Sequence, residues 1–258
     1  MIDLHNHLLG EDELEGSLEG ALSLCEQARR DGVKEIVVTL RAPKESREAE
    51  GQVKNYECRL QELRSRVGSQ LKLGRGYEWP LSADLHARLR GFPGAPTINE
   101  SHYLLLSFPS LHIPVGYERV MAQLLEDGYT PVIAHPECSR AVRRQVSLVA
   151  QLVQLGALVQ VDALSILGGY GMEVERFAHG LLERGQVHFI ATRAGQGARR
   201  EVSLSAACDH AARIIGGNSA RSLVDENPRA VLANTGLAET QPRGRRVPMF
   251  KAALSSWG

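Results

Sequence analysis

Cysteine is scarce in this sequence, and its four copies are scattered without a CxxC pair. This pattern argues against a disulfide framework and indicates free thiols in a reducing compartment. Apolar runs long enough to span a membrane are missing, and the opening MIDLHNH has no apolar core of a signal peptide. We therefore expect a soluble, cytoplasmic protein that does not insert into membranes.

An excess of either charge is also lacking. The 30 Lys and Arg residues balance 30 Asp and Glu residues, so nothing global predicts binding to nucleic acid or to an anionic membrane. Apolar residues make up 43% of the chain and charged residues 23%, an ordinary globular composition that can build a core. The 258 residues are enough for one large α/β domain or two small ones.

What the chain does contain is a regular alternation of short apolar runs with longer segments of helical period. The runs predict strands at 2–7, 34–40, 71–79, 103–108, 130–136, 157–163 and 187–194. Helices are predicted at 15–32, 53–68, 82–91, 117–128, 139–156, 174–185 and 203–217. Glycines, for example Gly128 and Gly156, stand where helices should end.

Seven such repeats predict a parallel sheet covered by helices, either an open doubly wound sheet or a barrel. The near-uniform spacing favours a TIM-like (β/α)7 barrel in a single α/β domain over residues 1–235, with functional residues at the C-terminal strand ends. After Asn234 the composition changes, and residues 236–258 are expected to form a flexible basic tail. The alternative is an arm that docks through its apolar residues Met249, Phe250 and Trp257.

The opening MIDLHNHLLG places two histidines two residues apart in a predicted strand. His5 and His7 should point to the same face, and neutral imidazoles suit zinc or manganese. The alternative is two unrelated histidines near a terminus. The other predicted strands end in these residues: Arg41, Glu78, Ser107, His135, Asp162 and Arg193. The two opening histidines with Glu78 and His135 would give three nitrogens and one oxygen, although each residue alone is more often a buried hydrogen-bonded group.

Six segments carry a specific resemblance: IDLHNHLL, SHYLLLSFPSLHIP, GYTPVIAHPE, GALVQVDALSILGGYG, VHFIAT and ENPRAVLAN. In order and spacing they resemble the bacterial tyrosine-protein phosphatases of the polymerase and histidinol phosphatase (PHP) superfamily, which act in capsule and exopolysaccharide biosynthesis. The resemblance implies a PHP-type barrel with a trinuclear site, usually manganese, that hydrolyses phosphotyrosine on a tyrosine kinase of polysaccharide export. It places His5, His7, Glu78 and His135 on metal-ligand positions.

Other family ligand positions are replaced in this chain. VTLRAP has Arg41 or Ala42 where the family has a histidine, and SFPS has Ser107 where it has a glutamate. TRAG has Arg193 and Gly195 in place of the aspartate and histidine of the family's SDAH. A guanidinium in place of a carboxylate repels a metal ion and cannot deprotonate. The resemblance therefore implies a degenerate metal site and a catalytically weakened or inactive relative, a pseudoenzyme.

Two functions follow for the altered site. In the main hypothesis Arg41, Arg193 and Arg199 bind phosphate, and the protein binds a phosphorylated partner, such as a bacterial tyrosine kinase of polysaccharide export, or regulates exopolysaccharide assembly. The alternative is that these arginines lie in a solvated loop and bind no ligand. In the second hypothesis the protein is an active metal-dependent phosphotyrosine phosphatase with one or two metals. The cofactor is then one divalent manganese or zinc ion on the three histidines and Glu78, or none.

Two further features are weighed on their residues. Asp162 stands on the strand next to Arg193, so an ion pair across the barrel mouth would neutralise the intruding guanidinium, although such a pair is weak when exposed. Cys138 and Arg144 have the C-x5-R spacing of thiol-dependent tyrosine phosphatases, but the intervening residues lack glycine, and Cys138 is more simply a small residue near the mouth. A homo-oligomer is left open.

Overall fold

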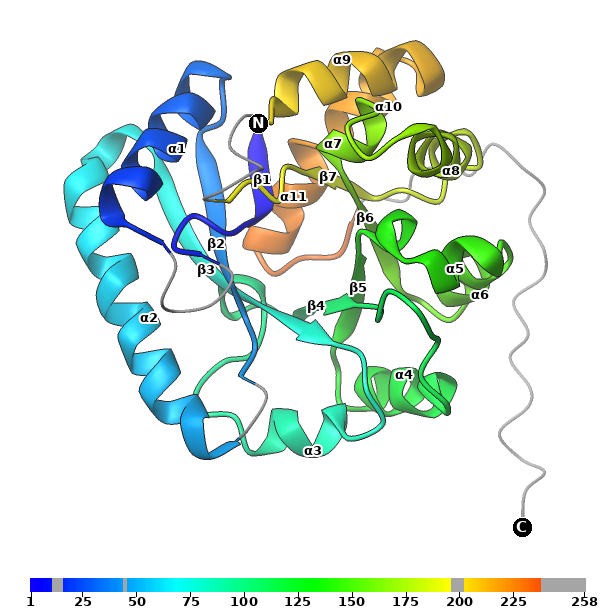
Figure 1. The fold of residues 1–258 in the computed structure, drawn as a ribbon, viewed down its shortest axis with the longest axis horizontal. Helices are drawn as coiled ribbons and strands as arrows, with labels where there is room; N and C mark the ends of the chain where they lie inside the picture. The colour runs from blue at the N-terminus through cyan, green and yellow to red at the C-terminus, as the bar shows by residue number, and fades with distance from the viewer. Residues whose placement is uncertain (11–15, 44–45, 196–201, 238–258) are drawn as a thin grey trace.

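Seven parallel strands in chain order form a single sheet (Figure 1). The computed structural model describes residues 1–10, 16–43, 46–195 and 202–237. The strands are β1 (Ile2–Asn6), β2 (Glu35–Arg41), β3 (Lys72–Pro80), β4 (Tyr103–Ser107), β5 (Thr130–Ala134), β6 (Leu158–Asp162) and β7 (Phe189–Ala191). The chain after β7 returns to β1, since Arg193 N donates to the His5 carbonyl at 2.9 Å and His7 N to the Ala194 carbonyl at 2.8 Å. The predicted (β/α)7 barrel is confirmed.

Most of the helices surround the sheet on its outer side, whereas the last one contributes Val231 to the apolar cluster inside the barrel (Figure 1). They are α1 (Leu18–Arg30), α2 (Ser46–Val67), α3 (Leu85–Arg90), α4 (Tyr117–Glu126), α5 (Arg140–Arg144), α6 (Leu148–Gln154), α7 (Ala163–Ile166), α8 (Met172–Glu183), α9 (Leu204–Ile215), α10 (Gly217–Ser222) and α11 (Glu226–Leu232), with 3₁₀ turns η1 (Gly68–Gln70), η2 (Ile98–Glu100) and η3 (Pro136–Cys138). None of the described helices is long and apolar enough to cross a membrane.

The segment 139–156, predicted as one helix, is two helices. Gln145 leaves the helical region with φ −113° and ψ 73°, and α6 begins three residues later. Val142 and Leu148 are both fully buried. In one continuous helix they would lie about 120° apart around the axis. The break lets both side chains face the core, which a search for helical period alone does not detect.

The interior of the barrel is apolar in the half that lies toward the N-terminal ends of the strands. Its core cluster contains Ile2, Leu4, Val37, Tyr103, Leu105, Val132, Ala134 and Phe189, together with Ile98 of η2 and Val231 of α11. Leu237 still packs against this cluster, while residues 238–258, with the predicted basic tail and its apolar anchors, lie outside the described residues. The polar side chains are left for the opposite, C-terminal half of the barrel.

A β-bulge in β1 brings the two opening histidines to the inner face. The register pairs Asp3 with Ile36 but Asn6 with Val38. Between these two pairs β1 advances by three residues and β2 by only two. Leu4 belongs to the inner apolar cluster, and His5 directly after it also faces inward, toward Glu78. Strict alternation would have placed Leu4 and His5 on opposite faces. A bulge of this kind re-aims side chains beside functional sites.

His188, at the start of β7, predicts an acid-sensitive fold. Its ring Nδ1 accepts a hydrogen bond from Val159 N at 3.1 Å, and burial lowers the pKa of His188 to about 4. An unfolded histidine has a pKa near 6.5, so between about pH 6.5 and pH 4 the unfolded chain binds a proton that the folded chain does not bind. The contribution of His188 to the free energy of unfolding is present above pH 6.5 and is lost as the pH falls toward 4. At pH 5 the loss is about 2 kcal/mol.

This prediction is tested by urea unfolding of the wild type and His188→Gln at pH 7 and pH 5. The variant keeps an acceptor but no titrating ring, so its free energy of unfolding should fall less on acidification. Equal losses in the two proteins would contradict the assignment.

Candidate metal centre at the barrel mouth

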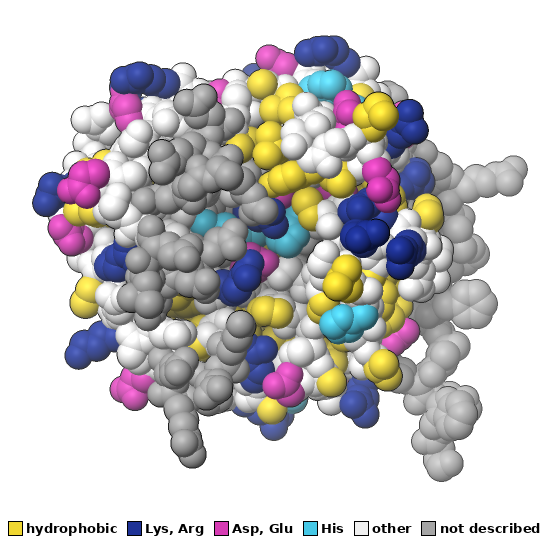
Figure 2. Space-filling view, viewed as in Figure 1, with side chains coloured by type: hydrophobic (Ala, Val, Ile, Leu, Met, Phe, Trp, Pro, Cys, Tyr) yellow, Lys and Arg dark blue, Asp and Glu magenta, His cyan; other side chains and the backbone are white. Residues whose placement is uncertain are grey.

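Three histidines and one glutamate meet inside the C-terminal end of the barrel. His5 Nε2 lies 3.3 Å and His7 Nε2 3.4 Å from Glu78 Oε2, and His135 Nε2 lies 3.3 Å from Glu78 Oε1. The residues come from β1, the bridge after it, β3 and the turn after β5, and all four are buried. Figure 2 shows histidine side chains in a hollow near the middle of this face, with charged side chains around it.

Hydrogen bonds fix the tautomers of the first two histidines. Gln160 Nε2 donates to Asp162 Oδ1 at 3.2 Å, so its Oε1 faces His5 Nδ1 at 2.9 Å. His7 Nδ1 lies 3.0 Å from the Thr39 carbonyl oxygen, which can only accept. Both Nδ1 atoms therefore carry the hydrogen, and both Nε2 atoms present lone pairs, 3.1 Å from each other.

The convergence of these acceptors favours the binding of a cation. Glu78 Oε2 is buried and has no hydrogen-bond partner, although it faces the two Nε2 atoms. Burial opposes ionisation, but the contact with His135 above all holds the pKa of Glu78 well below its ordinary value. One ligand atom from each of His5, Glu78 and His135 lies within 4.8 Å of the other two, and His7 Nε2 adjoins Glu78 at 3.4 Å. Because the Nδ1 atoms of His5 and His7 are bonded to oxygen atoms, these side chains offer a donor set suited to a divalent metal. The residues present therefore fit a metal ion.

Gln160 should raise the affinity of this site for a metal ion, although its side chain is not one of the ligands. Gln160→Leu removes the acceptor that holds the tautomer and ring orientation of His5. Loss of such a partner lowers metal affinity by roughly 10- to 100-fold. Calorimetric titration with manganese or zinc measures the effect, and Gln151→Leu on the exposed side of α6 serves as the matched control. Equal affinity in both variants would show that Gln160 does not position His5.

A group of acids lies beside the metal centre. Glu137 Oε1 accepts from Asp162 N at 2.8 Å and from Ser165 Oγ at 2.7 Å. Burial and the neighbouring charge of Asp162 raise the pKa of Glu137 to about 7. Glu137, Cys138 and Asp162 each place a ligand atom within 4.8 Å of the others, so these acids alone would also attract a cation.

Arg193 supplies positive charge to this acid group. Its Nε lies 3.2 Å from Asp162 Oδ2, as an ion pair without hydrogen-bond geometry, and its Nη2 donates to the Tyr170 hydroxyl at 3.4 Å. Burial opposes the charge, but Asp162 above all holds the pKa of Arg193 above its ordinary value. The structure thus places the predicted pair in contact and out of water, with side-chain exposures of 9% and 0%.

The other predicted residues lie around this mouth to different degrees. Arg41 ends β2 with its Cα in register with Glu78, and Ser107 is buried at the end of β4. Gly195 forms a bridge with His7, and a Cβ there would come within 3.3 Å of the His7 Cβ. Arg199 lies outside the described residues.

The thiol alternative has no support in the environment of Cys138. Its Sγ lies 3.7–3.9 Å from oxygens of Ser165, Asp162 and Glu137. Burial, then the charges of Glu137 and Asp162, raise the pKa of the Cys138 thiol above its ordinary value. A nucleophilic cysteine needs the opposite shift. Arg144 ends α5 with an exposed side chain. We therefore interpret Cys138 as a small, half-buried residue near the mouth.

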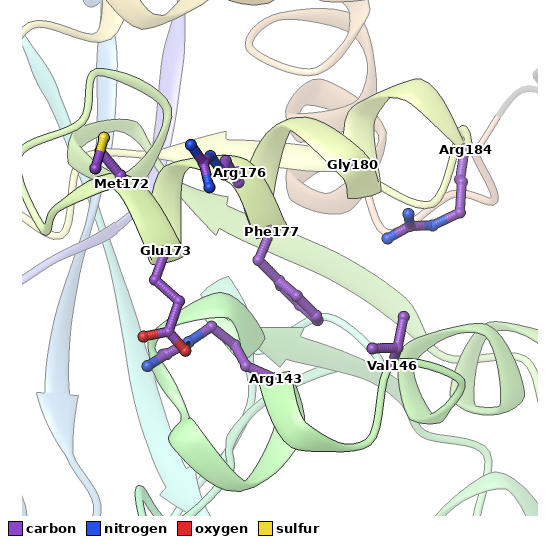
Figure 3. A pocket seen from close by; sticks show the side chains of 8 residues that line it. All are labelled: Arg143, Val146, Met172, Glu173, Arg176, Phe177, Gly180 and Arg184. Atoms are coloured by element: carbon purple, nitrogen blue, oxygen red, sulfur yellow. Dashed lines mark hydrogen bonds and ion pairs between the residues drawn. The ribbon is translucent and has the colours of Figure 1, made fainter.

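An arginine-lined groove lies beside α8 (Figure 3). Its volume is about 480 Å³, and its lining residues are Arg143, Val146, Met172, Glu173, Arg176, Phe177, Gly180 and Arg184. It lies between α8 and the break that separates α5 from α6, where Val146 and Met172 are exposed. Arg143 Nη1 donates to the Glu137 carbonyl at 2.7 Å, which connects the groove directly to the acid group.

Comparison with known proteins identifies the family of the chain. The family described as "Capsular polysaccharide synthesis, CpsB/CapC" matches residues 1–233. CapC of Staphylococcus aureus is 31% identical over 198 residues, which are 74% of this chain and 76% of CapC. Tyrosine-protein phosphatase CpsB of Streptococcus pneumoniae is 28% identical over 242 residues, which are 90% of this chain and 98% of CpsB.

Among solved structures, a chain from the work on YwqE of Bacillus subtilis and CpsB of Streptococcus pneumoniae, described there as unique metal-dependent tyrosine phosphatases, superposes with a TM-score of 0.81. The match has 26% sequence identity and covers 96% of this chain and all of that chain. With the family match over nearly the whole described fold, the chain belongs to the CpsB/CapC family of capsular polysaccharide synthesis.

Proposed function

We propose that this protein is a metal-dependent phosphotyrosine phosphatase that works with one divalent ion, manganese or zinc. The observation that carries the proposal is the convergence of the His5 and His7 lone pairs on the buried, unpartnered Glu78 Oε2. The similarity to metal-dependent tyrosine phosphatases supports the same activity. Such an ion supplies polarisation of phosphoryl oxygens and a water of lowered pKa.

The chain's own residues prepare this chemistry. Gln160 and the Thr39 carbonyl hold the two imidazoles in the ligand tautomer, and Glu78 lowers the net charge of the centre. Arg193 keeps a guanidinium at the mouth, where it can contact phosphate oxygens from the side not used by Asp162. The barrel wall keeps these groups out of bulk water, with Glu78 only 2% exposed, which strengthens every charge interaction among them.

The test combines metal content with turnover. Protein purified without chelator and then supplied with manganese or zinc should hold one ion per chain at this centre and should hydrolyse a phosphotyrosine peptide. His5→Ala should lose both the ion and the activity. A wild type that binds the ion yet shows no hydrolysis above a His135→Ala control would overturn the proposal.

A second function is favoured by the Arg193–Asp162 ion pair. The resemblance to the family implies an aspartate at the position of Arg193. The ion pair also neutralises the negative charge of Asp162, which a second metal ion would need. The protein would then bind a phosphorylated tyrosine of a partner, such as a tyrosine kinase of polysaccharide export, without cleaving it. Fluorescence anisotropy with a labelled phosphotyrosine peptide distinguishes the two, since this function requires stable binding and an intact peptide afterwards.

The groove beside α8 should select peptides over small phosphate esters. Three arginines against Glu173 give it a net positive charge, which suits acidic residues next to the phosphotyrosine. Arg176→Glu combined with Arg184→Glu should raise KM for an acidic phosphotyrosine peptide roughly tenfold and leave KM for a small aryl phosphate unchanged. Arg119→Glu, exposed on α4, is the matched control. Equal KM values for the peptide in both variants would contradict a role for the groove.

A further inference from the structure

A second group of metal-binding side chains lies outside the barrel, between α8 and α9. Glu175 and His179 are four residues apart on α8, so they share one face of that helix. His210 approaches from α9, with its ring centroid 5.0 Å from that of His179. One ligand atom from each of the three residues lies within 4.8 Å of the other two, and all three side chains are half-buried.

The two imidazoles are prepared to act as ligands. His179 Nε2 lies 3.0 Å from the Ile166 carbonyl oxygen, so this nitrogen carries the hydrogen and Nδ1 keeps its lone pair. A ring nitrogen bonded to a backbone carbonyl is the usual support of a metal-ligating histidine. Burial, together with His179 and Arg213, lowers the pKa of His210, a direction that favours the neutral ring.

We infer that Glu175, His179 and His210 form a binding site for a zinc-class divalent ion that is separate from the centre inside the barrel. Two imidazole nitrogens and a carboxylate oxygen suit zinc, cobalt or nickel better than magnesium or calcium, which prefer oxygen ligands. Ligands about 2.1 Å from one ion lie no more than about 4.2 Å apart, so these half-exposed side chains close by under 1 Å. The fourth position is left to water.

The ion would join three helices. Glu175 and His179 belong to α8, His210 belongs to α9, and the Ile166 carbonyl that supports His179 ends α7. Because α7 follows directly on Asp162 and carries Ser165 of the acid group, occupation of this outer site should stabilise the segment that forms one wall of the barrel mouth. Its role is therefore structural, and it can be measured without any enzymatic assay.

The test is a zinc titration of the full chain after removal of metal with chelator. Calorimetry should find one zinc ion fewer per chain in His210→Ala and in Glu175→Gln than in the wild type. His112→Ala, an exposed histidine elsewhere, is the matched control and should keep the wild-type number. His135→Ala should lose the ion of the barrel and keep this one. The zinc-induced rise in unfolding temperature should shrink in His210→Ala.

The outcome that overturns the inference is equally plain. If His210→Ala and Glu175→Gln bind as many zinc ions as His112→Ala, or if the ion they lose binds more weakly than about 1 mM, there is no such site. Glu175→Gln is nearly isosteric on a half-exposed helix face, so it separates loss of a ligand from loss of the fold. Far-ultraviolet circular dichroism of each variant provides the check.

Discussion

Glu78→Gln should remove the metal response of the barrel together with its phosphoester hydrolysis. Glutamine has the shape of glutamate but no charge, and its amide can donate a hydrogen to the Nε2 lone pair of His5 or His7. It thus satisfies the converging acceptors without a cation. We expect metal affinity to fall by at least 100-fold and hydrolysis by about 1,000-fold, since charge neutralisation and the activated water are lost together.

The stability of the metal-free protein should not fall in the same way on Glu78→Gln substitution. Glu78→Gln removes a charge from the interior, but it also removes the carboxylate contact with His135 that lowers the pKa of Glu78. These two effects oppose each other, so without metal the stability of Glu78→Gln should stay close to that of the wild type. Thermal unfolding with chelator, manganese or zinc measures both effects in one series. Glu62→Gln, an exposed carboxylate on α2, is the matched control. A Glu78→Gln protein that still gains stability from metal, or still hydrolyses phosphotyrosine, would show that the converging acceptors are not the metal centre.

The sequence predicted the barrel because each strand is an apolar run that can be recognised on its own. It also predicted the meeting of His5, His7, Glu78 and His135, since parallel strands in a barrel bring their C-terminal ends to one mouth. Those predictions need only order and strand ends. The bulge between Asp3 and Asn6 was not predictable in the same way, because an extra residue in one strand is defined only against the register of its neighbour.

The residues that sequence analysis missed are those whose role depends on register and on turns. Gln160 stands two residues before Asp162 in VQVD, and two polar residues with period two in an apolar strand were a usable signal for an inner polar face. Glu137 follows His135 and its η3 turn directs it back to Asp162 N, a contact that no spacing rule contains. Tyr170 reaches Arg193 from the segment after α7, which depends on tertiary packing alone.

The Gly195 position shows why departures from a family pattern are hard to interpret from sequence. A missing histidine looks like a simple loss of one ligand, yet the backbone at 195 pairs with His7 and leaves little room for a Cβ. Gly195→His would press on His7 and disturb a ligand that is present. Restoring Asp at 193 would likewise place a third carboxylate beside Glu137 and Asp162. We therefore expect no gain of activity from these two reversions without changes at Arg41 and Ser107.

Arg193→Ala should destabilise the metal-free protein by about 3–5 kcal/mol, because it leaves the carboxylate of Asp162 buried without its counter-charge. Both partners lie almost entirely out of water, so the small value of an exposed ion pair does not apply. Asp162→Asn should also destabilise, since it leaves a buried guanidinium. The double variant Asp162→Asn with Arg193→Ala removes both charges and should recover much of the loss, which gives a large coupling free energy.

Zinc should rescue Arg193→Ala more than it stabilises the wild type. Without the guanidinium, Glu137, Cys138 and Asp162 keep their ligand atoms within 4.8 Å of one another and can take up a cation in its place. Urea unfolding of the four proteins of the cycle, with chelator and with zinc, measures both effects. A coupling below about 1 kcal/mol would reduce the pair to a weak surface contact. A large coupling with no zinc rescue would mean that Arg193 completes the fold without occupying the place of a metal ion.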